Sequence, residues 1–265
     1  MRTANIFRAL LHQELLMISN YRWWLLAMQL SVASAPLISL LAWRGSIALG
    51  ATPPVTTEYL TSYLILVSVV TMLTSSWTAP FLAESIRMGT LNSWLVRPCS
   101  THVASAANNI AEKLAKLITL TPVILILAIY FRESFTLPTD LRLWAAFVLS
   151  LLLAAVMVYA LDIAIGALAF WWEDIASLER FRQLVAVVLS GAVVPFATLP
   201  DSWQEPLRYQ PFAYLASVPL DILLRPEQIG IIQSLLIECL WVAGALGLAV
   251  TVWRLGIKQY KGAGA

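Results

Sequence analysis

The chain has 265 residues with a formal net charge of +2, and its composition is 60% hydrophobic and 12% charged. Soluble domains carry about 25% charged residues, so this chain has too little polar surface to fold in water. The composition therefore predicts a polytopic membrane protein, and it excludes a nucleic-acid-binding protein, a secreted protein and a soluble catalytic domain.

Residues 1–20 have the pattern of an amphipathic helix. Its apolar side would hold Phe7, Leu10, Leu11, Leu15 and Ile18. Glu14 interrupts that side. We expect this helix to lie along the cytoplasmic membrane surface rather than to cross the bilayer. A plain helical extension of the first membrane span is the alternative.

Six apolar runs could cross a bilayer, which takes ~20 residues of helix. They cover residues 23–43, 60–83, 115–131, 143–171, 183–199 and 229–253. The fourth run contains Asp162 and the sixth contains Glu238. A charge at the bilayer centre costs ~2.5–3.5 kcal/mol on insertion scales, so such acids face a bundle interior or a cavity. Each acid is therefore a candidate for a translocation pathway or for a hydrogen-bonded contact between helices.

The segment 84–114, between the second and third spans, is the longest and most polar of the expected cytoplasmic segments. Glu84 and Arg87 are three residues apart and can pair on a helix that emerges from the second span. Gly89 permits a sharp turn after that helix. Thr90 can then cap a second, short helix.

We expect the short helix to run over residues 91–97, because Pro98 disfavours helix in the residue before it. Leu91, Trp94 and Leu95 would form its apolar side. A short helix held rigidly below the membrane suits a docking element for a cytoplasmic partner. A plain connecting loop is the alternative.

The segment 200–228, between the fifth and sixth spans, is rich in proline and aromatic residues. They are Pro200, Pro206, Pro211, Pro219 and Pro226, with Trp203, Tyr209, Phe212 and Tyr214. A long polar loop would not carry so many apolar groups. We expect short helices broken by proline that dip back into the outer leaflet, which is tolerated where protein or water covers the backbone.

The distribution of lysine and arginine predicts the orientation. With both termini in the cytoplasm, 12 of the 17 basic residues fall in cytoplasmic segments. The five outside would be Arg44, Arg132, Arg142, Arg208 and Arg225. Both termini are therefore expected in the cytoplasm, which agrees with an even number of spans.

The residues give no sign of an enzyme. The two histidines, His12 and His102, form no H-E-x-x-H motif, and no G-x-x-x-x-G-K-[ST] phosphate-binding loop occurs. Cys99 and Cys239 lie far apart and indicate neither a disulfide framework nor a metal site. We therefore predict no catalytic residue, no metal site and no cofactor bound by this chain.

One stretch of the polar segment reads Glu84-x-x-Arg87-x-Gly89-Thr90-Leu91-x-x-x-Leu95-x-Arg97-Pro98. It resembles the first cytoplasmic loop of ABC-2 type transporter permeases, in particular of the six-span branch that includes viologen-type xenobiotic exporters. Asn92 stands where many relatives have an acid, a departure that would change the docking contact without changing the fold.

Three other regions share this resemblance. They are Tyr21-Arg22 at the first span, Pro200 with Pro211-Phe212-x-Tyr214 and Pro219 in the outer segment, and the tail Trp253-Arg254-x-Gly256-x-x-x-Tyr260-x-Gly262-Ala263-Gly264. The resemblance thus covers the whole chain. It implies a single all-α membrane domain over residues 1–265, with six transmembrane helices of type V exporter-like architecture.

The resemblance also implies a function and partners. Such permeases pair, here as a heterodimer rather than a homodimer, and each docks on a separate ATP-binding-cassette ATPase subunit that holds the ATP and Mg. The N-terminal helix and the segment 84–114 would form the coupling surface, in a bacterial inner membrane. Coupling would fall to Glu84, Arg87, Gly89, Thr90, Leu91, Trp94, Leu95, Arg97 and Pro98. A non-transporting membrane scaffold and a lipid-modifying membrane enzyme are the alternatives.

Overall fold

The computed structural model describes residues 2–20, 22–97 and 100–260, and the regular elements among them are all helical. The α-helices are α1 (Arg2–Asn20), α2 (Arg22–Ala48), α3 (Thr57–Thr74), α4 (Thr78–Arg87), α5 (Leu91–Leu95), α6 (Thr101–Tyr130), α7 (Leu141–Ala167), α8 (Ala176–Leu189), α9 (Asp201–Tyr209), α10 (Ser217–Leu224) and α11 (Ile231–Ile257). The 3-10 helices are η1 (Leu168–Phe170), η2 (Phe196–Thr198), η3 (Pro211–Leu215) and η4 (Pro226–Gln228).

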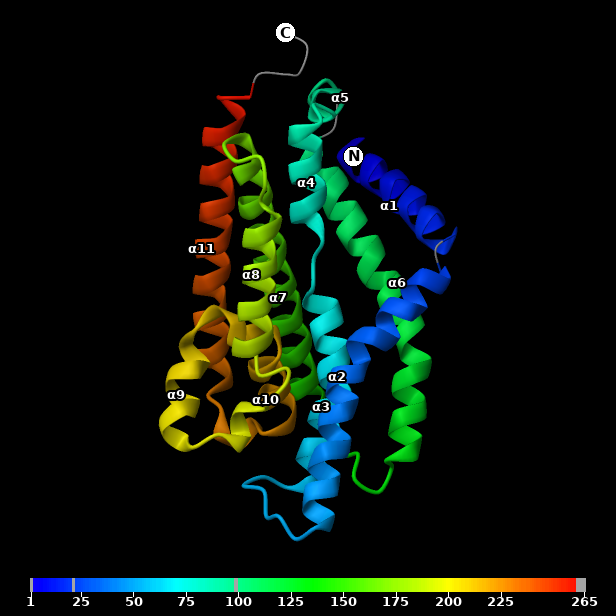
Figure 1. Cartoon of the computed structure of the whole chain (residues 1–265), viewed down its shortest axis with the longest axis vertical. Coiled ribbons are helices and arrows are strands. Elements are labelled where there is room, and N and C mark those ends of the chain that lie inside the picture. The colour runs from blue at the N-terminus through cyan, green and yellow to red at the C-terminus, as the bar shows by residue number, and fades with distance from the viewer. Residues whose placement is uncertain (1, 21, 98–99, 261–265) are drawn as a thin grey trace.

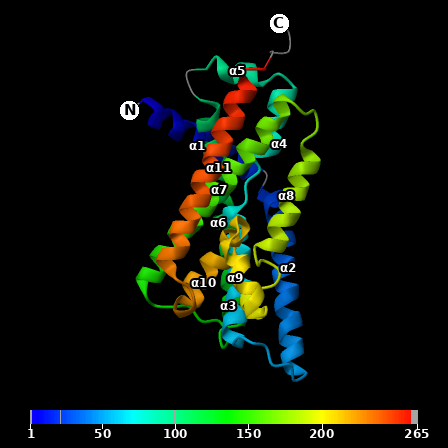
Figure 2. The same ribbon diagram turned by 90° about the vertical axis from the view of Figure 1, so that its left-hand side faces the viewer.

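The long helices form one elongated bundle (Figure 1). The start of α1, the short helix α5 and the end of α11 lie at one end of it, whereas α9 and α10 lie in its other half. α7 is the central helix and contacts α3, α4, α10 and α11. α8 lies at the edge of the bundle, with its N-terminal part beside α4 (Figure 2).

Four helical segments of the described chain are long and apolar enough to cross a membrane. They are Thr57–Arg87, Thr101–Tyr130, Leu141–Phe170 and Ile231–Ile257. They correspond to the second, third, fourth and sixth expected spans, although α6 begins at Thr101 and takes up the last part of the expected segment 84–114. α2 has 27 residues and covers the first expected span. The count of six spans stays a prediction.

The fifth expected span, residues 183–199, is not a continuous helix. α8 has 14 residues and ends at Leu189, whereas a span takes ~20. The chain turns at Gly191, whose φ of 81° favours glycine. The Tyr63 hydroxyl donates to the Gly191 carbonyl at 2.9 Å, and the Ser217 amide donates to the Ser190 carbonyl at 2.9 Å. These bonds hold the turn against α3 and α10.

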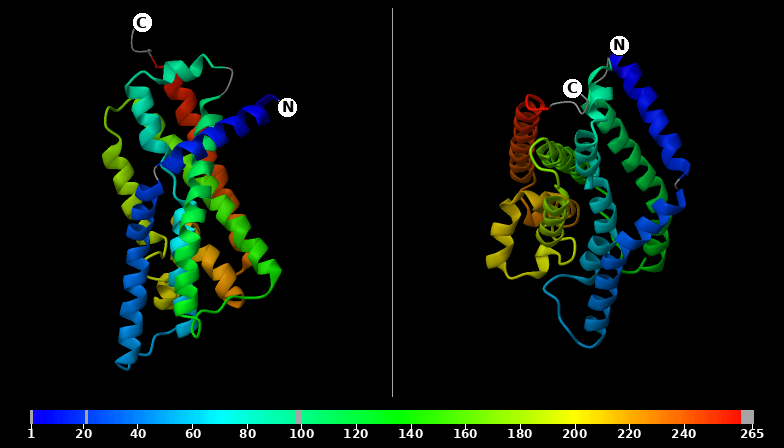
Figure 3. Two further views of the ribbon diagram at one scale, coloured as in Figure 1. Left: turned by 90° about the vertical axis from the view of Figure 1, so that its right-hand side faces the viewer. Right: turned by 45° about the horizontal axis from the view of Figure 1, so that its top comes forward.

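The N-terminal helix α1 packs along α6 with its expected apolar side (Figure 3). The five apolar residues of that side are all partly buried. Glu14, which interrupts the side, accepts a hydrogen bond from Asn108 of α6 at 2.7 Å. The acid that interrupts the apolar side of α1 therefore forms a polar contact between α1 and α6.

The C-terminal part of α11 packs around Phe170 of η1. The rings of Trp253 and Tyr260 each lie 5.6 Å from the Phe170 ring, centroid to centroid. A Cβ atom on Gly256 would collide with the same ring. Three residues of the tail motif thus share one packing contact. The end of that motif, from Gly262 to Gly264, lies outside the described residues.

α4 and α7 approach closely at Gly166. A Cβ atom there would lie 2.9 Å from the Ala79 carbonyl oxygen and 3.0 Å from the Leu82 Cβ atom. One of these neighbours is backbone and cannot move without displacing α4. Glycine at this position therefore sets the distance between the two helices.

Replacing Gly166 with alanine should lower the free energy of unfolding by about 1–3 kcal/mol, because the added methyl group overpacks the α4–α7 contact. Thermal unfolding of the detergent-purified protein measures the change. Gly244→Ala is the matched control, because nothing lies within 4 Å of that position. Equal unfolding midpoints for the two variants would contradict this account of the contact.

Candidate functional site

The second expected span, residues 60–83, is broken in its middle into α3 and α4. Ser75, Ser76 and Trp77 separate the two helices, and Ser75 is extended with φ −65° and ψ 153°. Pro80 lies in the first turn of α4 and has no N–H for the Ser76 carbonyl, so the helix cannot continue through the serines. The break leaves the last carbonyl groups of α3 and the first amide groups of α4 without helical partners.

Side chains of α6 cover the carbonyl end of the break. The Lys113 ammonium donates to the Ser75 carbonyl at 2.6 Å, and the Lys116 ammonium donates to the Ser75 hydroxyl at 2.8 Å. The Asn109 amide donates to the Ser76 hydroxyl at 3.0 Å. Positive charge at the C-terminus of a helix is favourable, because the carbonyl end carries a partial negative charge.

Asp162 of α7 covers the amide end of the break. Its carboxylate is fully buried and accepts hydrogen bonds from the Thr78 amide at 2.9 Å and the Ala79 amide at 3.3 Å. Arg182 of α8 donates to the other carboxylate oxygen at 3.0 Å. An anion at a helix N-terminus is favourable, because the amide end carries a partial positive charge.

Glu179 completes this buried group from the same helix as Arg182. It accepts from the Arg182 guanidinium at 2.6 and 3.0 Å and from the Gln183 amide at 2.9 Å. Burial alone would lower the pKa of Arg182, but its contacts with Glu179 and Asp162 outweigh burial and raise that pKa above its ordinary value. The guanidinium therefore stays charged and fixed between two acids.

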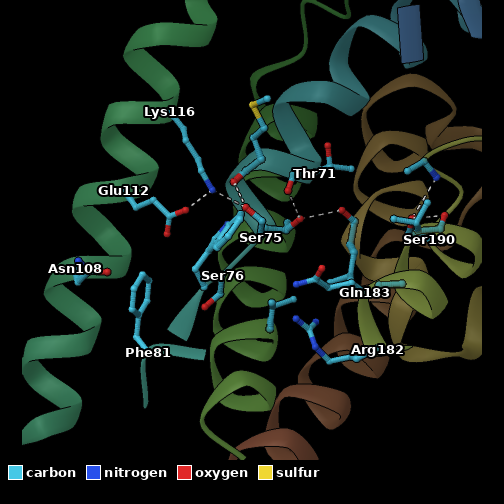
Figure 4. Close-up of a pocket in the computed structure, with 18 of the residues that line it drawn as sticks. Thr71, Ser75, Ser76, Phe81, Asn108, Glu112, Lys116, Arg182, Gln183 and Ser190 are labelled. Atoms are coloured by element: carbon cyan, nitrogen blue, oxygen red, sulfur yellow. Dashed lines mark hydrogen bonds and ion pairs between the residues drawn. The ribbon is translucent and has the colours of Figure 1, made fainter. Parts of the chain in front are cut away.

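A cavity of about 450 Å³ opens beside the break, between α3, α6 and α8. Figure 4 shows Glu112 and Lys116 on one side of it and Arg182 and Gln183 on the other. Lys116 forms an ion pair with Glu112 at 2.5 Å. Most of the remaining lining is apolar, so the cavity suits a largely apolar molecule with a few polar groups.

The end of α4 leads into the expected docking helix through a tight turn. Gly89 has a φ of 72°, and α5 follows over Leu91–Leu95. Leu91 is completely buried and packs in the same apolar cluster as Leu82 and Ile86 of α4. The buried leucine fixes the direction in which α5 leaves α4.

Two expected contacts of this segment are wrong. The Thr90 side chain does not cap α5, and its hydroxyl donates to the Ser85 carbonyl at 3.4 Å instead. Glu84 and Arg87 are both described and exposed, and no ion pair joins them. Side chains exposed to solvent gain little from pairing.

The short helix also ends earlier than expected. It stops at Leu95, two residues before Arg97, whose guanidinium stacks over the Trp94 ring at 4.1 Å. Pro98, the expected terminator, lies outside the described residues. Leu95 is exposed, so the expected apolar side is divided between the core and the surface.

Glu238 lies at the contact between α7 and α11. It is fully buried, and the Ser150 hydroxyl donates to its Oε2 atom at 2.7 Å. This is the arrangement of a hydrogen-bonded helix contact. A part in the pathway stays a prediction for this residue.

The outer-segment residues Pro211, Phe212 and Tyr214 belong to η3, and Tyr214 is buried in the core beneath it. Gln210 begins this element by accepting from the Phe212 amide at 2.8 Å and donating to the Leu189 carbonyl at 2.6 Å. The motif thus connects the end of α8 to the outer segment.

The neighbouring helix α10 is bonded to α3 through a buried aspartate. The hydroxyl of Tyr59 in α3 donates to Asp221 of α10 at 2.7 Å. Burial raises the pKa of this aspartate above its ordinary value.

The chain matches the family model of the ABC-2 family transporter proteins over residues 54–264. The chain belongs to this family. A comparison with curated proteins gave no match. The family identifies it as the permease component of an ABC transporter, a membrane transport component that works with an ABC ATPase partner.

The matched residues of this ABC-2 permease begin just before α3 and include the break, the cavity-lining parts of α6 and α8, the docking segment and the outer segment. Among the described residues, no three His, Cys, Asp or Glu side chains are grouped as metal ligands. The charged groups of the site are instead paired with one another and with backbone ends.

Most of this site was not predicted from the sequence. Arg182, Lys113 and the two serines of the break were missed, because each contacts a residue far away in the sequence. Glu179 was missed although its partners, Arg182 and Gln183, lie on its own helix. A signal was present nonetheless: two lysines on one side of an apolar helix, and the pattern Ser-Ser-Trp-Thr-Ala-Pro inside an apolar run.

Replacing Asp162 with alanine should lower the free energy of unfolding by about 3–5 kcal/mol, because it leaves two amides of α4 buried without their acceptor and removes one of the two acids that hold the buried Arg182. Thermal unfolding in detergent measures this loss. Asp174→Ala is the control: Asp174 also accepts from a helix-starting amide, that of Ala176 at 2.7 Å, but at the surface. That variant should lose about 1 kcal/mol. Similar losses in both variants would contradict a special role for the buried carboxylate.

Proposed function

We propose that the chain is one permease subunit of an ABC exporter and forms half of its translocation pathway. It pairs with a second ABC-2 permease, favoured as a different chain, and takes its energy from an ATPase subunit that holds ATP and Mg. It lies in the bacterial inner membrane with both termini in the cytoplasm. The exposed docking segment from α4 to α5 is the observation that carries this proposal.

The docking segment presents a surface suited to a protein partner. Met88, Leu95 and Val96 are 65%, 46% and 85% exposed. The exposed charged residues Arg87 and Arg97 lie next to them in the chain. Such exposed apolar groups rimmed by charge are typical of interaction sites. Since Leu91 anchors α5 in the core, a force on α5 acts on α4 instead of bending a loose loop.

The helix α1 lies at the same end of the bundle and beside α6 (Figure 1). It exposes Arg8 and His12, while Glu14 holds it to α6 through Asn108. The ATPase subunit would therefore meet two elements, α1 and α5, that are fixed to different helices, α6 and α4. We propose these two as the coupling surface.

The cavity beside the break supports a pathway shared with a second permease. α8, which forms one of its walls, exposes Phe181, Leu184 and Val188 at 63%, 62% and 65%. These side chains need lipid or another apolar protein surface to cover them. We place the second permease against this face of α8. We place the outer segment, with α9 and α10, in the outer leaflet.

Reversing either charge of the docking segment, by Glu84→Lys or Arg87→Glu, should weaken binding to the ATPase subunit about tenfold, because like charges then meet across the interface. Titration of the ATPase subunit onto the permease in nanodiscs measures this. Arg142→Glu, an exposed change at the start of α7 and the other end of the bundle, should leave binding unchanged. Unaltered binding in both docking variants would contradict the proposed surface.

The proposed orientation is tested by labelling single cysteines in a chain whose Cys99 and Cys239 are replaced by serine. Leu49→Cys lies beyond the end of α2, where the native side chain is 91% exposed, and Val96→Cys lies just after α5. A membrane-impermeant maleimide should label position 49 in intact cells and position 96 only after permeabilisation. Labelling of position 96 in intact cells would reverse the orientation.

A further inference from the structure

We infer that the Asp162–Arg182 ion pair transmits movement of the docking segment to α8, the helix that forms one wall of the cavity. Arg182 is then a positioning residue for transport. This inference rests on the proposed function, because it needs the ATPase subunit to move α4 and α5.

The first link joins α4 to α7. Asp162 accepts from two amides at the start of α4, at 2.9 and 3.3 Å. One helical turn further along α7, Gly166 lies so close to α4 that a Cβ atom would come within 2.9 Å of the Ala79 carbonyl. A hydrogen-bonded and a closely packed contact thus hold the two helices together, so that α7 follows a displacement of α4.

The second link joins α7 to α8. Arg182 donates to Asp162 at 3.0 Å, and Glu179 on its own helix holds the guanidinium at 2.6 and 3.0 Å. Two acids therefore fix the arginine side chain, one on each helix. Because the side chain cannot swing freely, a displacement of Asp162 acts on the backbone of α8.

The break allows this movement to act on one side of the cavity. Thr71 of α3 and Ser75 just after it line one wall, and Gln183 and Val187 of α8, with Ser190 just after it, line another. The non-helical residues between α3 and α4 let α4 change direction without carrying α3 along. Movement of α8 against a stationary α3 changes the width of the cavity.

α8 is suited to move because it lies at the edge of the bundle (Figures 2 and 3). Three of its large apolar side chains are more than half exposed. Since α8 packs little against the rest of its own chain, the buried ion pair is a major part of what attaches it to α7. Removing the pair should weaken the attachment of α8 to α4, which otherwise touch only near the start of α8, while leaving the docking segment in place.

The test places an environment-sensitive fluorophore on a single cysteine in the complete transporter, in nanodiscs with its ATPase subunit. One position is Val96→Cys, just after α5. The other is Leu184→Cys, on the face of α8 that we propose to meet the second permease, where the fluorophore reports movement of α8 against its neighbour. Cys99 and Cys239 are replaced by serine. With the native Arg182, addition of ATP should change the fluorescence at both positions.

Arg182→Gln should retain the ATP-dependent change at position 96 and reduce that at position 184 at least about fivefold, a coupling loss of the usual size. Arg182→Lys keeps the charge and should retain most of both signals. Asp162→Asn removes the charge from the other partner and should repeat the loss at position 184. Arg180→Gln, a neighbour on α8 that bonds Ser177 instead, is the matched control and should change neither signal.

Two results overturn the inference in different ways. If Arg182→Gln and Asp162→Asn both keep the signal at position 184, the ion pair does not transmit the movement, although the docking proposal stands. If ATP changes neither signal with the native Arg182, the docking proposal itself fails. The signal at position 96 distinguishes a loss of coupling from a loss of folding. A misfolded variant would lose the signals at both positions, whereas an uncoupled variant keeps the signal at position 96.

Discussion

Backbone groups inside an apolar bundle must find their hydrogen-bond partners within the protein, and the break between α3 and α4 is where this constraint acts. Three residues leave the helix in the middle of one apolar segment. Lysine from α6 covers the carbonyl end, and aspartate from α7 covers the amide end. The faces that α6 and α7 turn toward α3 and α4 follow from these contacts. The arginine of α8 then follows from the need to neutralise the buried aspartate.

The sequence predicts those parts of the fold that depend on a single segment. Apolar runs locate α7, α11 and the second half of α6, and the amphipathic pattern of residues 1–20 identifies the side of α1 that packs. The short proline-broken helices of residues 200–228 also follow from local composition. Each of these predictions uses period, length or a helix breaker, and none requires knowledge of a neighbouring helix.

The errors arise where a neighbour decides the local structure. The run at residues 183–199 is apolar enough for a span, yet Gly191 turns because Tyr63 and Ser217 hold it. Thr90 has the residue type of a helix cap, but Gly89 and the burial of Leu91 leave its hydroxyl facing the preceding turn. Asp162 was recognised as a buried acid from its position in an apolar run. Its role at the start of α4 could not be predicted, because 84 residues separate it from Thr78.

The buried charges have a physical reason that composition alone conceals. A continuous apolar helix in place of α3 and α4 would satisfy its own backbone, and it would need neither Lys113 nor Asp162. A buried ion pair is often less stable than apolar residues of the same volume, so stability does not explain why this permease contains one. The break separates α4 from α3, while Asp162 and Arg182 join α4 to α7 and α8. The same few charged residues therefore satisfy a broken helix and determine which helices can move together.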